Sequence, residues 1–218
     1  MLNILVIGDS HIKHFKNQKT KLIEYTVVRT GGASAQGLTN LNSKRKTLKK
    51  IQKFFNSNTK KFDYVILCFG EVDCNATMWY YKEKYNQTIN QALERTLVNY
   101  RTFINTYILS RFNRQQIIIF NPILPTVSDN YPQTYEIRKL ITATQKERTN
   151  LTDEFSNRLK IMADNNTWTL LSINNFIRNN NTGMIDESFI KNPLDHHLPK
   201  ALSFKLWNSQ LEDFIFDN

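Results

Sequence analysis

A serine and a pair of histidines stand near opposite ends of the sequence, in settings that suit nucleophilic catalysis. Gly8–His11 reads Gly-Asp-Ser-His after an apolar run, and 195–197 reads Asp-His-His close to the C-terminus. A serine at a tight strand-to-helix turn presents its hydroxyl at the end of a sheet, where backbone N–H groups can stabilise an oxyanion. A histidine can accept the Ser10 proton when a carboxylate fixes its tautomer, and Asp195 is placed for that role beside His197.

Two further polar segments follow apolar runs. Gly31–Leu38 reads Gly-Gly-Ala-Ser-Ala-Gln-Gly-Leu, and its glycines let the backbone approach a ligand and supply an oxyanion donor. Gly70–Asn75 reads Gly-Glu-Val-Asp-Cys-Asn, so Glu71 and Asp73 place two carboxylates at a site mouth, where they transfer protons or cap the turn. The G-x-G-x-x-G spacing of dinucleotide-binding turns is absent.

Short apolar runs alternate with helix-compatible stretches along the whole chain. Continuous apolar runs are typical of strands buried on both faces. The alternation predicts a single α/β domain over 1–218, with a doubly wound, mostly parallel five-stranded sheet flanked by helices. Ligand sites in such sheets lie at the carboxyl ends of the strands. We expect strands at Leu2–Gly8, Ile23–Arg29, Asp63–Phe69, Gln115–Asn121 and Thr167–Ile173, and helices at about 43–57, 84–111, 134–164 and 199–214.

The net charge of +10 is concentrated in one stretch, because residues 42–61 contain eight Lys or Arg and no acid. Such a segment suits nucleic acid, an anionic surface or solubility. Basic helical stretches are usually solvated faces, and no nucleic-acid motif accompanies this one. We therefore expect no nucleic-acid partner, and interpret the segment as solubilising or as favouring an anionic glycan or surface beside the site.

The remaining composition excludes several classes of protein. A content of 40% hydrophobic and 22% charged residues is that of a soluble globular chain, and no apolar run approaches the length of a membrane span. Because no export signal is visible either, we expect a cytoplasmic protein. Cys68 and Cys74 are too few for a disulfide scaffold, and we expect Cys68 to be a buried thiol. His196 and His197 should diverge, with no third ligand placed beside them, so we expect no metal and no cofactor.

The four polar segments, in this order and spread over most of the chain, resemble the blocks of the GDSL/SGNH hydrolases, and in particular a subgroup often found beside sugar-transferring enzymes. The resemblance implies a flavodoxin-like three-layer sandwich. It also implies that Ser10 is the nucleophile, His197 the general base and acid, and Asp195 its orienting partner. The N–H groups of Ser10 and Gly32 would hold the oxyanion, with Gly31 as the alternative because the glycine pair leaves the alignment uncertain by one residue.

Two positions depart from the family pattern. The third block normally supplies an asparagine to the oxyanion, but Val72 stands there, and one lost donor costs about 3 to 4 kcal/mol of transition-state stabilisation. Asn75 is a candidate substitute. The aspartate normally precedes the histidine by three residues, whereas Asp195 precedes His197 by two, so the alternatives are a local bulge, His196 as the base, or another acid such as Asp186.

These observations predict a serine esterase or deacetylase that works through an acyl-serine intermediate, with a small-molecule or glycan ester, most naturally an O-acylated carbohydrate, as substrate. The alternative is a catalytically weakened glycan-binding module on the same fold. Further candidates for contacting the substrate or supporting the site are Asp9, His11, Glu71, Asp73 and His196.

Overall fold

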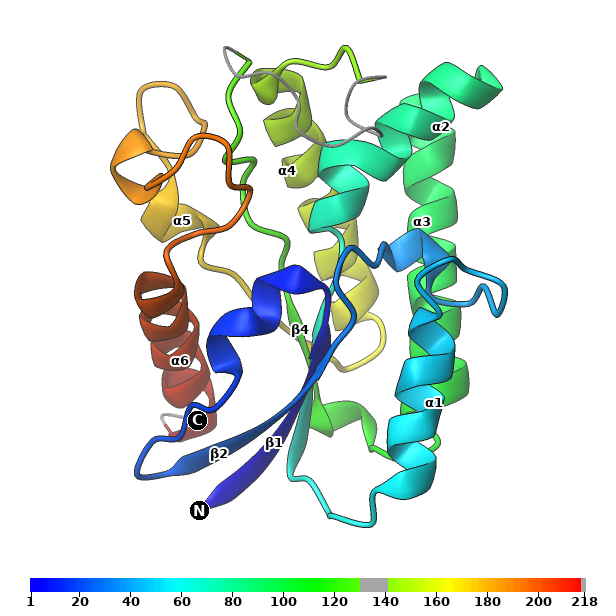
Figure 1. The fold of residues 1–218 in the computed structure, drawn as a ribbon, viewed down its shortest axis with the longest axis vertical. Coiled ribbons are helices and arrows are strands. Elements are labelled where there is room, and N and C mark those ends of the chain that lie inside the picture. Colours follow the sequence, from blue (N-terminus) through cyan, green and yellow to red (C-terminus); the bar gives the residue numbers. More distant parts are fainter. Residues whose placement is uncertain (130–140, 217–218) are drawn as a thin grey trace.

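The computed structural model describes residues 1–129 and 141–216 and contains one central sheet (Figure 1). Its five strands lie in the order β2-β1-β3-β4-β5, and every neighbouring pair is parallel, as expected for a flavodoxin-like sheet. The predicted doubly wound architecture is confirmed. The strands are β1 (Leu2–Gly8), β2 (Ile23–Arg29), β3 (Tyr64–Cys68), β4 (Ile117–Phe120) and β5 (Thr169–Leu171).

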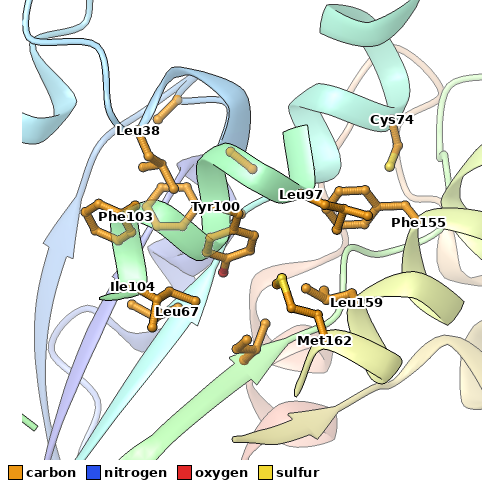
Figure 2. Packing of buried hydrophobic residues seen from close by; sticks show 14 of the residues in the cluster. Leu38, Leu67, Cys74, Leu97, Tyr100, Phe103, Ile104, Phe155, Leu159 and Met162 are labelled. Atoms are coloured by element: carbon orange, nitrogen blue, oxygen red, sulfur yellow. The ribbon is translucent and has the colours of Figure 1, made fainter. Parts of the chain in front are cut away.

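Alternate strand residues feed two separate hydrophobic clusters, one on each face of the sheet. Leu5 and Leu67 belong to the cluster under α1 (Thr47–Ser57), α3 (Ile89–Phe103) and α4 (Gln145–Asp164). Val6 and Ile66 belong to the cluster under α5 (Asn174–Ile177) and α6 (Lys200–Phe216). Figure 2 shows Tyr100 of α3 and Phe155 of α4 among the side chains that pack in the first cluster, together with Leu67 of β3. The continuous apolar runs in the sequence therefore reflect strands covered on both faces.

The helices form an outer layer on each side of the sheet, with α5 and α6 opposite α1, α3 and α4 in Figure 1. Short 3₁₀ and π-helical turns connect several of them. The α-helices are α1 (Thr47–Ser57), α2 (Met78–Tyr85), α3 (Ile89–Phe103), α4 (Gln145–Asp164), α5 (Asn174–Ile177) and α6 (Lys200–Phe216).

The helix predicted over about 84–111 is present from Ile89 to Ile108 but begins later than predicted, because the chain breaks between α2 and α3. Asn86 adopts a left-handed conformation (φ 50°) after α2. Thr88 then begins α3 with a capping box, in which its side chain accepts from the Gln91 N–H while the Gln91 side chain accepts from the Thr88 N–H. This Thr-x-x-Gln pattern is a recognisable helix start. Beyond Phe103 the helical path continues as a π-helical turn to Ile108.

Two other helices begin later than predicted. Lys46 is left-handed (φ 51°), so α1 starts at Thr47 and the residues before it form a turn. The part of the predicted helix 134–164 before 141 lies outside the described residues, and residues 141–144 are not helical. Thr144 caps α4 through a reciprocal pair of hydrogen bonds with Glu147.

Cys68 and Cys74 are both buried free thiols, as expected of Cys68. Within the described ranges, no helix is long and apolar enough to cross a membrane.

Candidate active site

The carboxyl ends of β1, β2 and β3 lie side by side, so the segments that follow these strands meet. Gly8 is in register with Arg29 of β2 and with Cys68 of β3. Hydrogen bonds continue the pairing past the strands: the Asp9 N–H donates to the Cys68 carbonyl at 3.1 Å, and the Thr30 N–H donates to the Gly8 carbonyl at 2.8 Å. Three of the four predicted segments are thereby brought to one edge of the sheet.

Gly8 is needed where β1 approaches β3. A Cβ at this position would lie 2.6 Å from the Cys68 carbonyl oxygen and 2.7 Å from Ile12 Cγ2. Because these distances are shorter than van der Waals contact, a larger residue would displace the turn that carries Ser10.

Ser10 is the first residue of a buried 3₁₀ helix, Ser10–Phe15, that follows directly from β1. Asp9 caps this helix, because its Oδ1 accepts from the His11 N–H at 2.8 Å. Ser10 is 7% exposed, and its hydroxyl has no hydrogen-bond partner in the described part of the chain. The predicted nucleophile therefore lies at the carboxyl end of β1 without being committed to another group.

Asp195 and His197 form a hydrogen-bonded pair despite their two-residue spacing. Asp195 Oδ1 accepts from the His197 N–H at 3.0 Å and lies 2.6 Å from His197 Nδ1. The turn closed by the first bond brings the carboxylate to the ring, so the unusual spacing needs no bulge. Asp186, the alternative acid, lies elsewhere: its carboxylate accepts from Ser188 and Asn179.

His197 is held as a neutral imidazole. Burial lowers its pKa to about 4, assisted by the positive charges of His11 and Lys13 and opposed by Asp195. When Nδ1 donates to Asp195, the lone pair is on Nε2, which is buried and has no hydrogen-bond partner among the described residues. This is the form that a general base requires.

Ser10 and His197 are not hydrogen-bonded to each other, and the contact between their two segments is made by His11. The His11 ring, one residue after Ser10, lies 4.6 Å from the His197 ring between centroids, with planes at 37°. Catalytic hydrogen bonds are often long without substrate and shorten in the complex.

His11 is buried (7% exposed), and both of its ring nitrogens face acceptors. Nδ1 lies 3.0 Å from Asp9 Oδ1, and Nε2 lies 3.0 Å from the His196 carbonyl oxygen. Glu71 Oε2 is 3.7 Å from Nδ1. Burial acts to lower the pKa of His11, but the charges of Glu71 and Asp9 outweigh it and raise the pKa to about 9. No sequence pattern signals this contact between segments 185 residues apart.

Glu71 and Asn75 belong to a buried polar network with Arg148 of α4. Asn75 Nδ2 donates to Glu71 Oε1 at 3.0 Å, and Arg148 Nη1 donates to Asn75 Oδ1 at 3.2 Å. One amide N–H of the proposed substitute oxyanion donor is thus occupied by Glu71. Sequence reasoning missed Arg148, although a charged residue three positions before Leu151 on the apolar face of a helix is a recognisable signal for a buried ion.

Asp73 fixes the loop that follows β2. Its fully buried carboxylate accepts from the Ala35 N–H at 2.5 Å and from the Gln36 N–H at 3.1 Å. Burial raises the pKa of Asp73 to about 7 against these two bonds. In the same loop, the N–H groups of Gly31 and Gly32 donate to no acceptor in the described chain, so both candidates for the second oxyanion donor remain available.

Three histidines come close enough to suggest a metal site, contrary to the expectation that His196 and His197 diverge. One nitrogen each of His11, His196 and His197 lie within 4.8 Å of one another. The arrangement does not fit an ion as it stands, because both ring nitrogens of His11 are already directed at oxygen acceptors.

The architecture gives this chain the fold of the GDSL/SGNH hydrolases. Among solved structures, it is similar over 99% of its length to a GDSL-like lipase from Bacteroides thetaiotaomicron, with 88% of that chain covered, a TM-score of 0.60 and 12% identity. A member of the lipolytic G-D-S-L family from Veillonella parvula matches over 100% of both chains, with a TM-score of 0.55 and 13% identity.

An acetyl xylan esterase is also similar, with 95% of this chain and 99% of that chain covered, a TM-score of 0.54 and 16% identity. By sequence, no family profile and no curated protein matches. The likeness at these identities is one of fold.

Proposed function

We propose that this protein is a serine esterase of the GDSL/SGNH type. The observation that carries the proposal is the Asp195–His197 pair: the carboxylate lies at Nδ1, Nε2 has no partner among the described residues, and the ring packs against His11, the neighbour of Ser10. A carboxylate, an imidazole and a hydroxyl in this order are the groups needed to activate a serine.

In the proposed reaction, Ser10 Oγ attacks the ester carbonyl carbon while His197 Nε2 accepts the hydroxyl proton. The tetrahedral oxyanion is stabilised by the N–H groups of Ser10 and of Gly32 or Gly31. His197 then protonates the leaving alkoxide, which departs as an alcohol and leaves an acyl-serine. Water, deprotonated by His197, attacks the acyl carbon and releases the acid and Ser10. No metal or organic cofactor takes part in these steps.

The substrate that we propose is an O-acylated carbohydrate bearing negative charge. An acetyl xylan esterase shares the fold. Arginines also flank the two glycines: a Cβ on Gly32 would lie 3.3 Å from Arg45 Nη2, and one on Gly31 would lie 3.8 Å from Arg29 Nη2. Both arginines are exposed, and neither makes an ion pair or hydrogen bond within the described ranges. Guanidinium groups without a protein partner bind carboxylate and phosphate well.

Labelling with a fluorophosphonate tests the proposed chemistry. We expect the parent protein to be labelled at Ser10 and to hydrolyse p-nitrophenyl acetate, and we expect Ser10→Ala to lose both properties. A parent protein that is neither labelled nor active on p-nitrophenyl acetate would refute the esterase proposal.

The second candidate is a glycan-binding module that has lost catalysis. The observation that favours it is the replacement of the usual oxyanion asparagine by Val72, together with the occupation of one Asn75 amide N–H by Glu71. Binding of an acylated glycan by both the parent and Ser10→Ala, measured by calorimetry, with no turnover by either, would support this candidate.

A further inference from the structure

We propose that His11 is a positioning residue of the active site: as an imidazolium, it joins the turn that carries Ser10 to the loop that carries Asp195 and His197. The proposal of a role in catalysis rests on the proposed esterase function. The protonation state on which it depends is a property of the folded chain and can be measured with or without activity.

The hydrogen bonds of His11 require the imidazolium. A neutral imidazole has one N–H and one lone pair, so it can donate to only one acceptor. Here Nδ1 faces the Asp9 carboxylate and Nε2 faces the His196 carbonyl, each at 3.0 Å. Neither acceptor is a donor when Asp9 is ionised, and a neutral ring would direct a lone pair at one of these oxygens. Only the doubly protonated ring satisfies both contacts.

The charges around His11 stabilise that form. Two carboxylates, Asp9 and Glu71, face the ring from the nucleophile turn and from the segment after β3. Two of the neighbouring histidines carry no opposing charge at neutral pH, because burial lowers the pKa of His14 to about 3 and that of His197 to about 4. The rings of His11 and His197 face each other. The other titratable and charged groups near them are Asp9, Lys13, His14, Glu71, Asp195 and His196.

The contact with the His196 carbonyl places the next residue. His11 Nε2 holds the backbone one residue before His197, and the two rings lie 4.6 Å apart. Asp195 orients the His197 ring through Nδ1. Because a fixed positive charge beside His197 disfavours a second proton there, His11 keeps His197 neutral in acid as well as holding its position.

Nitrogen NMR of the histidine rings tests the protonation state directly in the parent protein. We expect His11 to show two protonated ring nitrogens at pH 7.5, while His197 shows one. A neutral His11 tautomer at that pH would overturn the proposal, and this result does not depend on whether the protein hydrolyses esters. If His11 is doubly protonated but the protein is inactive toward esters, the esterase function and the role of His11 in catalysis are both refuted. The hydrogen bonds by which His11 joins the two segments would still stand.

The pH profile of His11→Gln tests the effect on catalysis. Glutamine keeps a donor but removes the charge, so we expect the acid limb of kcat/KM for p-nitrophenyl acetate to move upward from near pH 4, by about one pH unit. A merely structural role would lower activity without moving this limb. His14→Gln is the matched control, since His14 lies in the same 3₁₀ helix, bonds Ser203 and is neutral. An unchanged limb in His11→Gln, or an equal shift in His14→Gln, would contradict the role.

Discussion

Asp195 binds His197 twice through one carboxylate oxygen, at the backbone N–H (3.0 Å) and at ring Nδ1 (2.6 Å). Burial acts to raise the pKa of Asp195, but the hydrogen bonds from His197 outweigh it and hold the pKa below its ordinary value. The carboxylate is therefore ionised wherever His197 is a base. The same bonds explain how an Asp-to-His spacing of two residues serves where three are usual. The hydrogen bond from the His197 N–H closes a turn that brings the Asp195 carboxylate to the His197 ring.

Replacing Asp195 by Asn is expected to lower kcat for p-nitrophenyl acetate by about 10³- to 10⁴-fold, because an amide can donate to Nδ1 and so favour the wrong tautomer. Asp195 is 42% exposed, so the thermal midpoint should change little. Steady-state kinetics together with circular dichroism melting checks both expectations. Asp186→Asn is the matched control, since Asp186 bonds Ser188 and Asn179 instead. A large loss of kcat in Asp186→Asn and none in Asp195→Asn would reverse the assignment.

The protonation states of His11 and His197 predict how stability depends on pH. Folding raises the pKa of His11 from 6.5 to about 9, so its stabilisation is complete below pH 6.5 and is lost as pH rises to 9. Folding lowers the pKa of His197 to about 4, so the unfolded chain takes up a proton first and stability is lost as pH falls from 6.5 to 4.

Urea unfolding between pH 4 and pH 10 measures these two limbs. We expect His11→Gln to abolish the alkaline decline of about 3 kcal/mol in the free energy of unfolding. The acid decline should remain but become smaller, because loss of the His11 charge raises the pKa of His197. An alkaline decline of the same size in parent and variant would show that another group causes it.

The sheet was predictable from the sequence because its signals are local. β1 and β2 begin and end at the predicted residues. β1 is an almost continuous apolar run that contributes to the clusters on both faces of the sheet, whereas β2 is an edge strand in which only Ile23 and Tyr25 are buried. The start of the helix predicted over about 84–111 was wrong because periodicity continues across Asn86 and Thr88, and only the left-handed turn and the capping box mark the break. A search for the Thr-x-x-Gln pattern would have found it.

The site was predictable only where it follows from strand ends. Ser10 and the glycine pair come together because parallel strands align their carboxyl ends. The His11–His196 contact and the buried Arg148 join segments that lie far apart in the chain, and residue types alone do not specify which side chains meet there. The turn at Lys46 is a further case, since it places Arg45 in a loop against Gly32 rather than in helix α1.

The charge of the substrate is tested by Arg45→Gln. If Arg45 binds an anionic group beside Gly32, kcat/KM for an acetylated uronoside should fall by about 3- to 5-fold, while that for the matched neutral acetylated glucoside stays the same. The effect should shrink at high salt, because the residue is exposed. Lys53→Gln removes one exposed charge from the same basic segment within helix α1 and should leave the ratio of the two substrates unchanged. Equal losses for both substrates in Arg45→Gln would mean that Arg45 does not select for charge.

Asp73→Asn is expected to loosen the loop that follows β2. The Asp73 carboxylate accepts backbone N–H groups on both oxygens, at Ala35 and Gln36, whereas an amide has one oxygen and would direct its NH₂ group at one of these donors. Because the site is fully buried, we expect a loss of about 1 to 3 kcal/mol in the free energy of unfolding.

The loop bound by Asp73 contains Gly31 and Gly32, so the same variant should also lower kcat for p-nitrophenyl acetate more than it raises KM. Asp63→Asn is the control, because Asp63 accepts the Asn3 N–H at an exposed position, where solvent replaces a lost hydrogen bond. Denaturant unfolding gives the free energy of unfolding of the two variants, and steady-state kinetics gives their kcat and KM. An Asp73→Asn protein with parental stability and kcat would show that the loop after β2 holds its position without this carboxylate.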